Sequence, residues 1–220
     1  MRIDEDLKLE NMISLGSSSS GKSHFIKEQA KIANPNRFIV FDMSIEWGNV
    51  LPDTVAISGI KNLYEYLVKN PIARIQYRPT FEKDEYPNFC KLVKAWASVD
   101  IGKLWCIVEE AGSLAKGAGK AQSGELEIIT QGRKYGIKFI YITQSMSDGT
   151  KTILKNCSKI RFGRMDLLDI DYFQKRYGKD LGDKIRALKG KEGILFDIEK
   201  MKIIQFLPDT RSQKDKDADN

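Results

Sequence analysis

The sequence contains few of the residues on which many metal and hydrolytic sites depend. Its 220 residues include three cysteines, Cys90, Cys106 and Cys157, which lie far apart and form no CxxC pair. An odd number of dispersed cysteines indicates reduced, structural thiols in an intracellular protein and argues against a disulfide framework. Since His24 is the only histidine, a histidine-based zinc site and a Ser–His–Asp triad have little support.

Long apolar segments are absent as well. No run approaches the roughly 20 apolar residues that a helix needs to cross a bilayer. The first ten residues, MRIDEDLKLE, lack the apolar stretch of a signal peptide, so we expect a soluble protein without a transmembrane segment. Lys and Arg number 36 against 30 Asp and Glu. This modest excess fits a polyanionic partner such as nucleic acid about as well as an ordinary basic protein.

Short apolar runs alternate with amphipathic segments, and this alternation predicts the fold. The expected strands cover residues 12–15, 37–41, 54–57, 72–77, 104–108, 138–143, 159–162, 193–198 and 201–206. The expected helices cover residues 22–32, 60–68, 88–99, 125–135, 167–177 and 181–188. The order predicts an α/β fold with a mostly parallel sheet, helices on both faces and a C-terminal β-hairpin. We expect one domain over residues 1–210 and a disordered polar tail over residues 211–220.

Residues 16–23 match the pattern GxxxxGK[ST] at every fixed position, between an expected strand and an expected helix. Glycines let backbone N–H groups turn toward phosphate oxygens, and the positive end of the following helix faces the same anion. Lys22 is expected to reach the β- and γ-phosphates and Ser23 to ligate Mg2+. The predicted nucleotide-binding residues are Gly16, Ser17, Ser18, Ser19, Ser20, Gly21, Lys22, Ser23 and His24. For His24, a surface or packing position is favoured over a catalytic role.

The alternative interpretation of this segment is a flexible serine-rich turn. The flanking strand and amphipathic helix favour the phosphate-binding loop, and they predict ATP and Mg2+ as cofactors. No base-reading motif distinguishes ATP from GTP.

Two acids follow the apolar run LWCIV, at the carboxyl end of an expected buried strand. Ligands of parallel α/β sheets bind at this edge. Glu109 is expected to hold the magnesium ion, directly or through water, and Glu110 to orient and deprotonate the attacking water. In isolation, a solvated acidic turn would explain the pair better, but the phosphate-binding loop upstream favours the catalytic interpretation. Gln144 ends another strand, where it can contact the γ-phosphate or the water, or can simply cap a turn.

These motifs together resemble the FtsK/HerA superfamily of DNA-translocating ATPases. The resemblance rests on the phosphate-binding loop and on three further segments: Phe41-Asp42-x-x-x-Glu46-Trp47, Ile107-Val108-Glu109-Glu110-Ala111, and Gly132-Arg133-Lys134-Tyr135-Gly136-Ile137 leading into Ile142-Thr143-Gln144. One position departs from the usual pattern, because Glu109 stands where the magnesium-associated acid is commonly Asp.

The resemblance implies a RecA-like core, self-association into a pentameric or hexameric ring, and ATP sites between subunits. Arg133 stands where such proteins tend to carry a basic residue that faces the neighbouring subunit's phosphates. It is therefore a candidate arginine finger, with Arg161 and Arg164 as rivals and an ordinary surface arginine as the alternative.

In its small size and its motifs, the chain most resembles the genome-packaging ATPases of tailless, membrane-containing viruses. This implies an ATPase that translocates double-stranded DNA, located in the host cytoplasm or in the virion, with capsid vertex or portal proteins as partners. Lys116 and Lys120, in a glycine-rich loop, are the candidate DNA contacts, although an ordinary surface loop explains them as well. The alternatives are a cellular or plasmid DNA pump for conjugation or repair, an assembly or secretion factor that does not grip DNA, and a small-molecule kinase.

Overall fold

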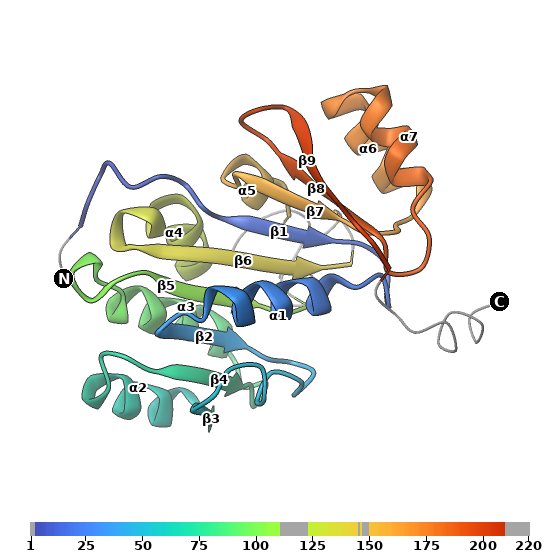
Figure 1. Cartoon of the computed structure of the whole chain (residues 1–220). Helices are drawn as coiled ribbons and strands as arrows, with labels where there is room; N and C mark the ends of the chain where they lie inside the picture. Colours follow the sequence, from blue (N-terminus) through green and yellow to red (C-terminus); the bar gives the residue numbers. More distant parts are fainter. Residues whose placement is uncertain (1–2, 111–122, 145, 147–149, 210–220) are drawn as a thin grey trace.

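The computed structural model describes residues 3–110, 123–144, 146 and 150–209. Within these ranges the chain forms a nine-stranded sheet in the order β3-β4-β2-β5-β6-β1-β7-β8-β9 (Figure 1). The strands are β1 (Met12–Leu15), β2 (Arg37–Phe41), β3 (Thr54–Ser58), β4 (Arg74–Arg78), β5 (Leu104–Val108), β6 (Ile137–Thr143), β7 (Lys159–Phe162), β8 (Gly193–Asp197) and β9 (Lys202–Leu207). All neighbouring pairs from β3 to β7 are parallel, whereas β8 and β9 run antiparallel to their neighbours.

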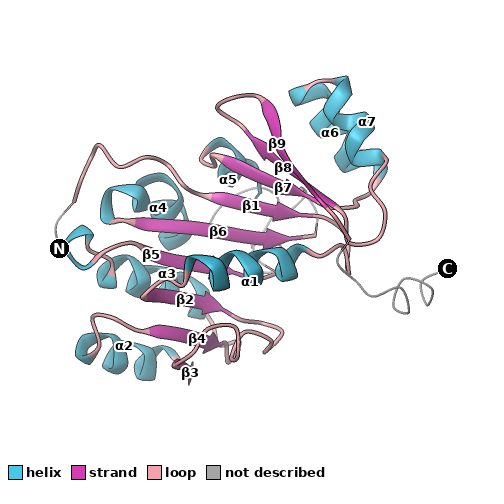
Figure 2. Cartoon of the chain, in the orientation of Figure 1, coloured by secondary structure: helices cyan, strands magenta, loops and turns pink. Residues whose placement is uncertain are grey.

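Helices cover both faces of the sheet (Figure 2). The α-helices of the described ranges are α1 (Lys22–Ala33), α2 (Ile60–Lys69), α3 (Glu85–Trp96), α4 (Ser123–Gln131), α5 (Thr150–Lys155), α6 (Leu167–Tyr177) and α7 (Lys179–Arg186). Helix α1 packs on one face together with Trp47, and the remaining helices contribute to the core on the other face. None of these helices combines the length and the hydropathy that crossing a membrane requires.

Alternating side chains of the central strands supply both cores. In β2, Phe38 and Val40 face α1, while Ile39 and Phe41 pack in the opposite core. Both sets are buried, which explains why this strand reads as a continuous apolar run rather than an alternating one. The mostly parallel sheet and the antiparallel C-terminal hairpin expected from the sequence are therefore confirmed.

Several helix boundaries expected from the sequence were wrong. Helix α3 begins at Glu85 and ends at Trp96, rather than covering residues 88–99. Pro87 lies in its first turn, where a missing N–H costs no intrahelical hydrogen bond. The helix expected over residues 125–135 ends at Gln131 and continues as a 3-10 turn, Gly132–Tyr135. Helix α5 was not expected, and the polar tail lies outside the described residues.

A buried asparagine ties the start of β1 to three other segments. The Asn11 side chain is 1% exposed, and its Nδ2 donates to the carbonyls of Ile129 (3.2 Å) and Asn156 (3.0 Å). Its Oδ1 accepts from the backbone N–H of Phe139 at 3.1 Å. One amide group therefore links β1 and β6 to the carboxyl-terminal ends of α4 and α5.

We predict that Asn11→Ala lowers the free energy of unfolding by about 2–4 kcal/mol, because it leaves two buried backbone groups and one partly buried one without their partner. Urea denaturation checks this value. Asn36→Ala, at an exposed asparagine, is the matched control and should change stability by less than about 0.5 kcal/mol. An Asn11→Ala protein as stable as this control would contradict the role given to the amide.

Candidate nucleotide-binding and catalytic site

The glycine-rich loop connects β1 to α1 at the carboxyl end of the sheet. Gly21 precedes α1 with a left-handed backbone, φ 82°, and no side chain caps the helix. A Cβ at this position would lie 3.1 Å from Nη2 of Arg161 and 3.2 Å from Cβ of Lys191. The position therefore needs glycine for its backbone angle and for lack of space. The uncapped N–H groups at the start of α1 form the kind of anion site that the motif predicts.

A cavity of about 380 Å³ opens beside this loop. It brings together segments that lie far apart in the sequence: the loop itself, the turn after β2, the acids after β5, and the connection between α7 and β8. The lining residues are Ser18, Ser19, Gly21, Lys22, Ser23, His24, Ser44, Glu46, Glu109, Glu110 and Lys191. The structure thus gathers most of the expected phosphate-binding residues, both expected acids and His24 around one hollow, whereas Gly16, Ser17 and Ser20 do not line it.

Lys22 is turned back onto its own loop. Its Nζ donates to the carbonyl of Ser17 at 2.8 Å, and the residue is only 6% exposed. Burial lowers the pKa of Lys22, and the carboxylates of Glu110 and Glu109 act in the opposite direction. The ammonium therefore stands at the wall of the cavity and is held by a backbone carbonyl that a phosphate oxygen can replace.

Glu109 faces the first turn of α1. Its Oε1 accepts from the Ser23 hydroxyl at 2.7 Å, and its Oε2 accepts from the Ser44 hydroxyl. Burial raises the pKa of Glu109, and the nearby negative charge of Asp42 adds to that rise. A carboxylate and a hydroxyl in contact are hard oxygen donors of the kind that Mg2+ takes when it also binds substrate phosphates. A cation would also relieve the burial of this charge, so the pair fits the expected metal.

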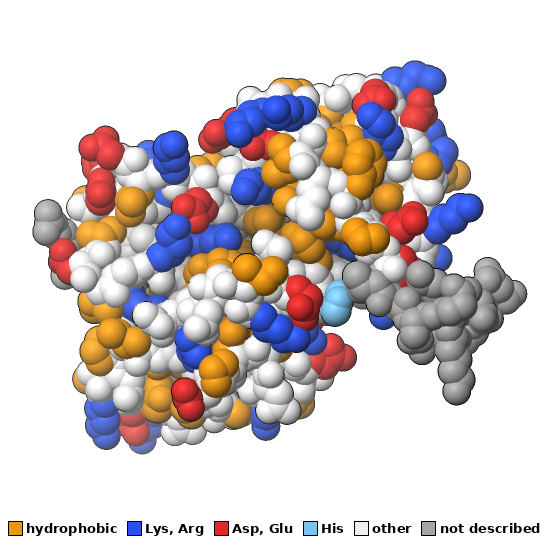
Figure 3. All heavy atoms as spheres, viewed as in Figure 1, with side chains coloured by type: hydrophobic (Ala, Val, Ile, Leu, Met, Phe, Trp, Pro, Cys, Tyr) orange, Lys and Arg blue, Asp and Glu red, His pale blue; other side chains and the backbone are white. Residues whose placement is uncertain are grey.

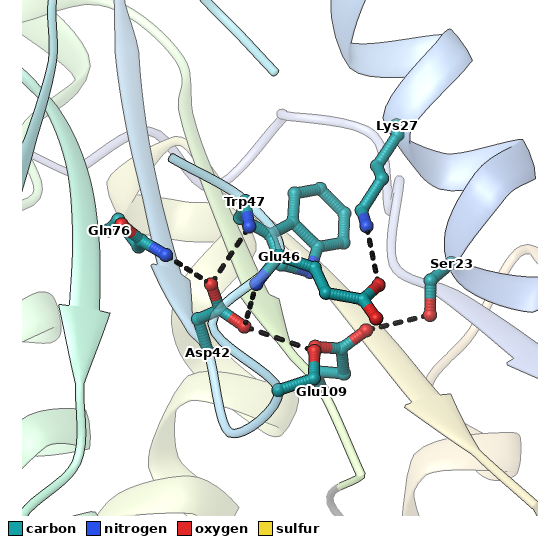
Figure 4. Close-up of polar contacts among 8 residues, drawn as sticks. Ser23, Lys27, Asp42, Glu46, Trp47, Gln76 and Glu109 are labelled. Carbon is teal, nitrogen blue, oxygen red and sulfur yellow. Dashed lines mark hydrogen bonds and ion pairs between the residues drawn. The ribbon is translucent and has the colours of Figure 1, made fainter. Parts of the chain in front are cut away.

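Sequence reasoning assigned no role to Asp42, which follows β2 as Glu109 follows β5. Asp42 is fully buried, and its carboxylate accepts from the backbone N–H groups of Trp47 (2.9 Å) and Glu46 (3.3 Å). It also accepts from the side chain of Gln76 (Figure 4), and from the hydroxyl of Ser44. These bonds fix the turn after β2 and place Ser44 against Glu109. The available signal was a lone acid directly after the apolar run RFIVF.

Glu110 and Gln144 meet at the ends of adjacent strands. The Gln144 Nε2 donates to both carboxylate oxygens of Glu110, at 3.1 and 3.2 Å. The parallel register of β5 and β6, in which Val108 pairs with Tyr141, carries both side chains to the same edge. Gln144 therefore lies beside Glu110, and its action on a phosphate or a water stays a prediction.

The candidate arginines occupy three different settings. Arg133 lies before β6, at the opposite edge of the sheet from the phosphate-binding loop, and its Nη1 donates to the carbonyls of Glu5 and Leu7 at 2.8 Å each. It does not reach this chain's own site, so a role toward a neighbouring subunit stays a prediction. Arg164 is exposed, and its carbonyl accepts from the backbone N–H of Ser17 at 2.7 Å.

Arg161, the third arginine, is an internal brace rather than a surface group. It is 1% exposed, and its Nη2 donates to the carbonyl of Ser20 at 2.6 Å. Burial lowers the pKa of Arg161 to about 10. A Cβ at Gly163 or Gly193 would lie 2.3 or 2.9 Å from this guanidinium group, so small residues make the space for it. A buried group that supports its own loop is not available to a neighbouring subunit.

The candidate DNA contacts, Lys116 and Lys120, lie outside the described residues. On the face of the molecule shown in Figure 3, basic and acidic side chains are interspersed rather than collected in one basic band.

The chain is similar in sequence to a known phage protein. No known protein-family model matches the chain. Over 159 residues, 71% of this chain and 69% of the relative, the sequence is 30% identical to protein P9 of Pseudoalteromonas phage PM2.

Solved structures share the fold at low sequence identity. The genome packaging NTPase B204 of Sulfolobus turreted icosahedral virus 2, in complex with AMP, superposes with a TM-score of 0.75 at 17% identity, covering 92% of this chain and 98% of B204. VirB4 of Thermoanaerobacter pseudethanolicus gives 0.63 at 13% identity, covering 94% and 90%. The bacterial conjugative coupling protein TrwBdeltaN70 gives 0.66 at 9% identity, covering 96% and 87%. At these identities the likenesses show that the chain shares its fold with B204, VirB4 and TrwBdeltaN70.

The raised pKa of Glu109 predicts a pH-dependent effect on stability. The folded protein holds this proton more tightly than the unfolded chain, so the group's contribution to stability is lost as pH rises through the folded pKa. We expect Glu109→Gln to raise Tm at about pH 8 and to leave it nearly unchanged at about pH 4, where both states are protonated.

Thermal melts of both proteins at the two pH values test this expectation. Glu199→Gln, at an exposed glutamate, is the control and should give no pH-dependent difference. A Glu109→Gln protein with an equal or lower Tm at the higher pH would show that the buried charge is not a cost to folding.

Proposed function

The chain belongs to the family of protein P9 of Pseudoalteromonas phage PM2, and from its site and its fold we propose that it is a P-loop ATPase that moves double-stranded DNA, as the motor that packages a viral genome into a capsid. One observation carries the enzymatic part of the proposal. The phosphate-binding loop, the Ser23–Glu109 pair and the Glu110–Gln144 pair line or border one cavity at the carboxyl edge of a parallel sheet. This is the edge at which such sheets bind ligands.

In the proposed reaction the loop and Lys22 hold the triphosphate. The Lys22 ammonium leaves the Ser17 carbonyl and binds phosphate oxygens, while the N–H groups at the start of α1 hold the same anion. Ser23 and Glu109 are the residues that would hold Mg2+, which neutralises charge on the transferring phosphoryl group when bound.

Glu110 is the proposed general base. Its carboxylate lines the cavity, and it accepts the proton of the attacking water as the water forms its bond to the γ-phosphorus and the bond to ADP breaks. Gln144 fixes the carboxylate orientation through two hydrogen bonds, which keeps one oxygen directed at the water. Both residues follow strands other than β1, so each can be altered without changing the phosphate-binding loop itself.

Packaging is favoured over the other motor functions by the extent of the structural match. The chain covers 98% of B204, a genome packaging NTPase, compared with 90% of the VirB4 chain and 87% of the TrwBdeltaN70 chain. We further propose that the protein acts as a ring docked on a capsid vertex or portal, in the host cytoplasm or in the virion, with Arg133 or Arg164 facing a neighbouring site. The folds of VirB4 and TrwBdeltaN70 favour a plasmid or cellular DNA pump as the second candidate.

We predict that Glu110→Gln retains ATP but hydrolyses it about 10²–10⁴-fold more slowly, because it removes the base and keeps the shape of the side chain. Phosphate release measures turnover, and retention of labelled ATP on a filter measures binding. Lys22→Ala should lose the binding itself, and Glu199→Gln should match the wild type in both assays. Turnover near the wild-type rate in Glu110→Gln would remove Glu110 from the mechanism.

The coupling to DNA gives a separate prediction. We expect duplex DNA to increase the rate of ATP hydrolysis, and we expect the Lys116→Ala/Lys120→Ala protein to lose this increase while it keeps the basal rate. DNA affinity should fall with salt, with a slope of about −0.9 for each phosphate neutralised. The Lys69→Ala/Lys83→Ala protein carries the same change of charge at exposed positions elsewhere and should behave as wild type. A rate that duplex DNA does not alter would favour the assembly factor over either motor.

A further inference from the structure

One segment that lines the nucleotide cavity plays no part in the sequence argument. This segment is the connection between α7 and β8, and its Lys191 lines the cavity together with the phosphate-binding loop. A Cβ placed on Gly21 would lie 3.2 Å from both Cβ and the carbonyl oxygen of Lys191. The backbone of Lys191 is therefore packed directly against the loop that precedes Lys22.

Two contacts hold Lys191 in this position, and a third closes the turn around it. Its backbone N–H donates to the carboxylate of Asp209 at 3.0 Å. Its carbonyl lies 3.4 Å from Nη2 of Arg161, the same nitrogen that donates to the carbonyl of Ser20. The Glu192 carboxylate accepts from the backbone N–H of Lys189 at 2.9 Å and closes the turn. The stem of the Lys191 side chain therefore starts from a fixed point beside the phosphate-binding loop.

The acidic lining of the cavity also favours a further cation near the phosphates. Its lining contains three glutamates, Glu46, Glu109 and Glu110, and two lysines, of which Lys191 is the second. Burial already lowers the pKa of Lys22. A nucleotide triphosphate adds several negative charges to this set. A compact ammonium on a four-carbon stem that leaves the loop backbone can reach phosphate oxygens in the same hollow.

We propose that Lys191 is a second phosphate-binding lysine, which contacts the polyphosphate of the nucleotide held by Lys22. This inference rests on the proposed function and deepens it, because it adds a contact from the same chain to the site. The connection between α7 and β8, which precedes the C-terminal hairpin, thereby contributes a nucleotide-binding residue to that site. The contact strengthens nucleotide binding and is not required for the chemical step.

The test is a comparison of nucleotide affinities by titration with a fluorescent ATP analogue. Lys191→Ala should weaken ATP binding by about tenfold or more, the effect of one lost charge-assisted hydrogen bond, and should change kcat much less. Lys191→Arg should restore most of the affinity. Lys189→Ala removes an exposed lysine from the same turn that does not line the cavity, and it should bind as wild type.

Competition with inorganic tripolyphosphate identifies the part of the nucleotide that is contacted. If Lys191 binds phosphate, Lys191→Ala should weaken tripolyphosphate and ATP by similar factors, and the difference from wild type should shrink in high salt. If ATP weakens while tripolyphosphate does not, the side chain contacts the base or ribose, and the proposal is overturned. Equal ATP affinity in Lys191→Ala and wild type would overturn it as well.

Two further measurements distinguish a loss of stability, a failure of the proposed function and a failure of the role given to Lys191. If Lys191→Ala has a lower Tm than wild type, Lys191→Met, which keeps most of the apolar stem, replaces it in the same titrations. Wild-type protein that binds no nucleoside triphosphate would refute the proposed function as a whole. Wild-type protein that binds ATP normally beside an unaffected Lys191→Ala would refute only the role of Lys191.

Discussion

The site depends on the parallel, in-register pairing of four central strands, which brings the carboxyl ends of β1, β2, β5 and β6 to one edge. Leu15 pairs with Thr143, and Phe41 pairs with Val108, so the residues that follow each strand emerge side by side. Shifting one strand by a single residue would turn its side chains to the other face and move its terminal group out of reach. The fixed register therefore makes a phosphate-binding loop, two acids and an amide from distant parts of the chain into neighbours.

Two carboxylates buried near each other show how the fold supports an unfavourable arrangement. Asp42 and Glu109 end adjacent strands, and each has its own set of hydrogen-bond donors, with Ser44 contacting both. The donors to Asp42 come from the turn that follows it and from Gln76 on β4, so that charge is part of the scaffold. The Glu109 carboxylate borders the cavity, where a cation can reach it. Asp42 therefore supports the turn and Glu109 is accessible to a cation, although both acids directly follow an apolar strand in the sequence.

Local patterns were sufficient to predict the sheet and the central site, because both rest on short contiguous segments. Strands such as β2 and β5 are apolar throughout, and the phosphate-binding motif is eight consecutive residues, so neither requires knowledge of distant contacts. The support around the site could not be predicted in this way. Gln76 lies 34 residues from the carboxylate that it binds, and Arg161 lies 141 residues from Ser20. Only the folded sheet shows that Arg161 braces the loop and that Arg133 lies at the far edge.

The Arg161 guanidinium also has a consequence for how this protein can change over evolutionary time. Its Nη2 lies between the Ser20 carbonyl and the carbonyls of Lys191 and Glu192. Connections between secondary-structure elements usually tolerate insertions. This one cannot lengthen freely, because extra residues would displace the carbonyls that a buried cation uses as hydrogen-bond acceptors. We expect lineages of this protein to keep the length of that turn while exposed connections elsewhere vary.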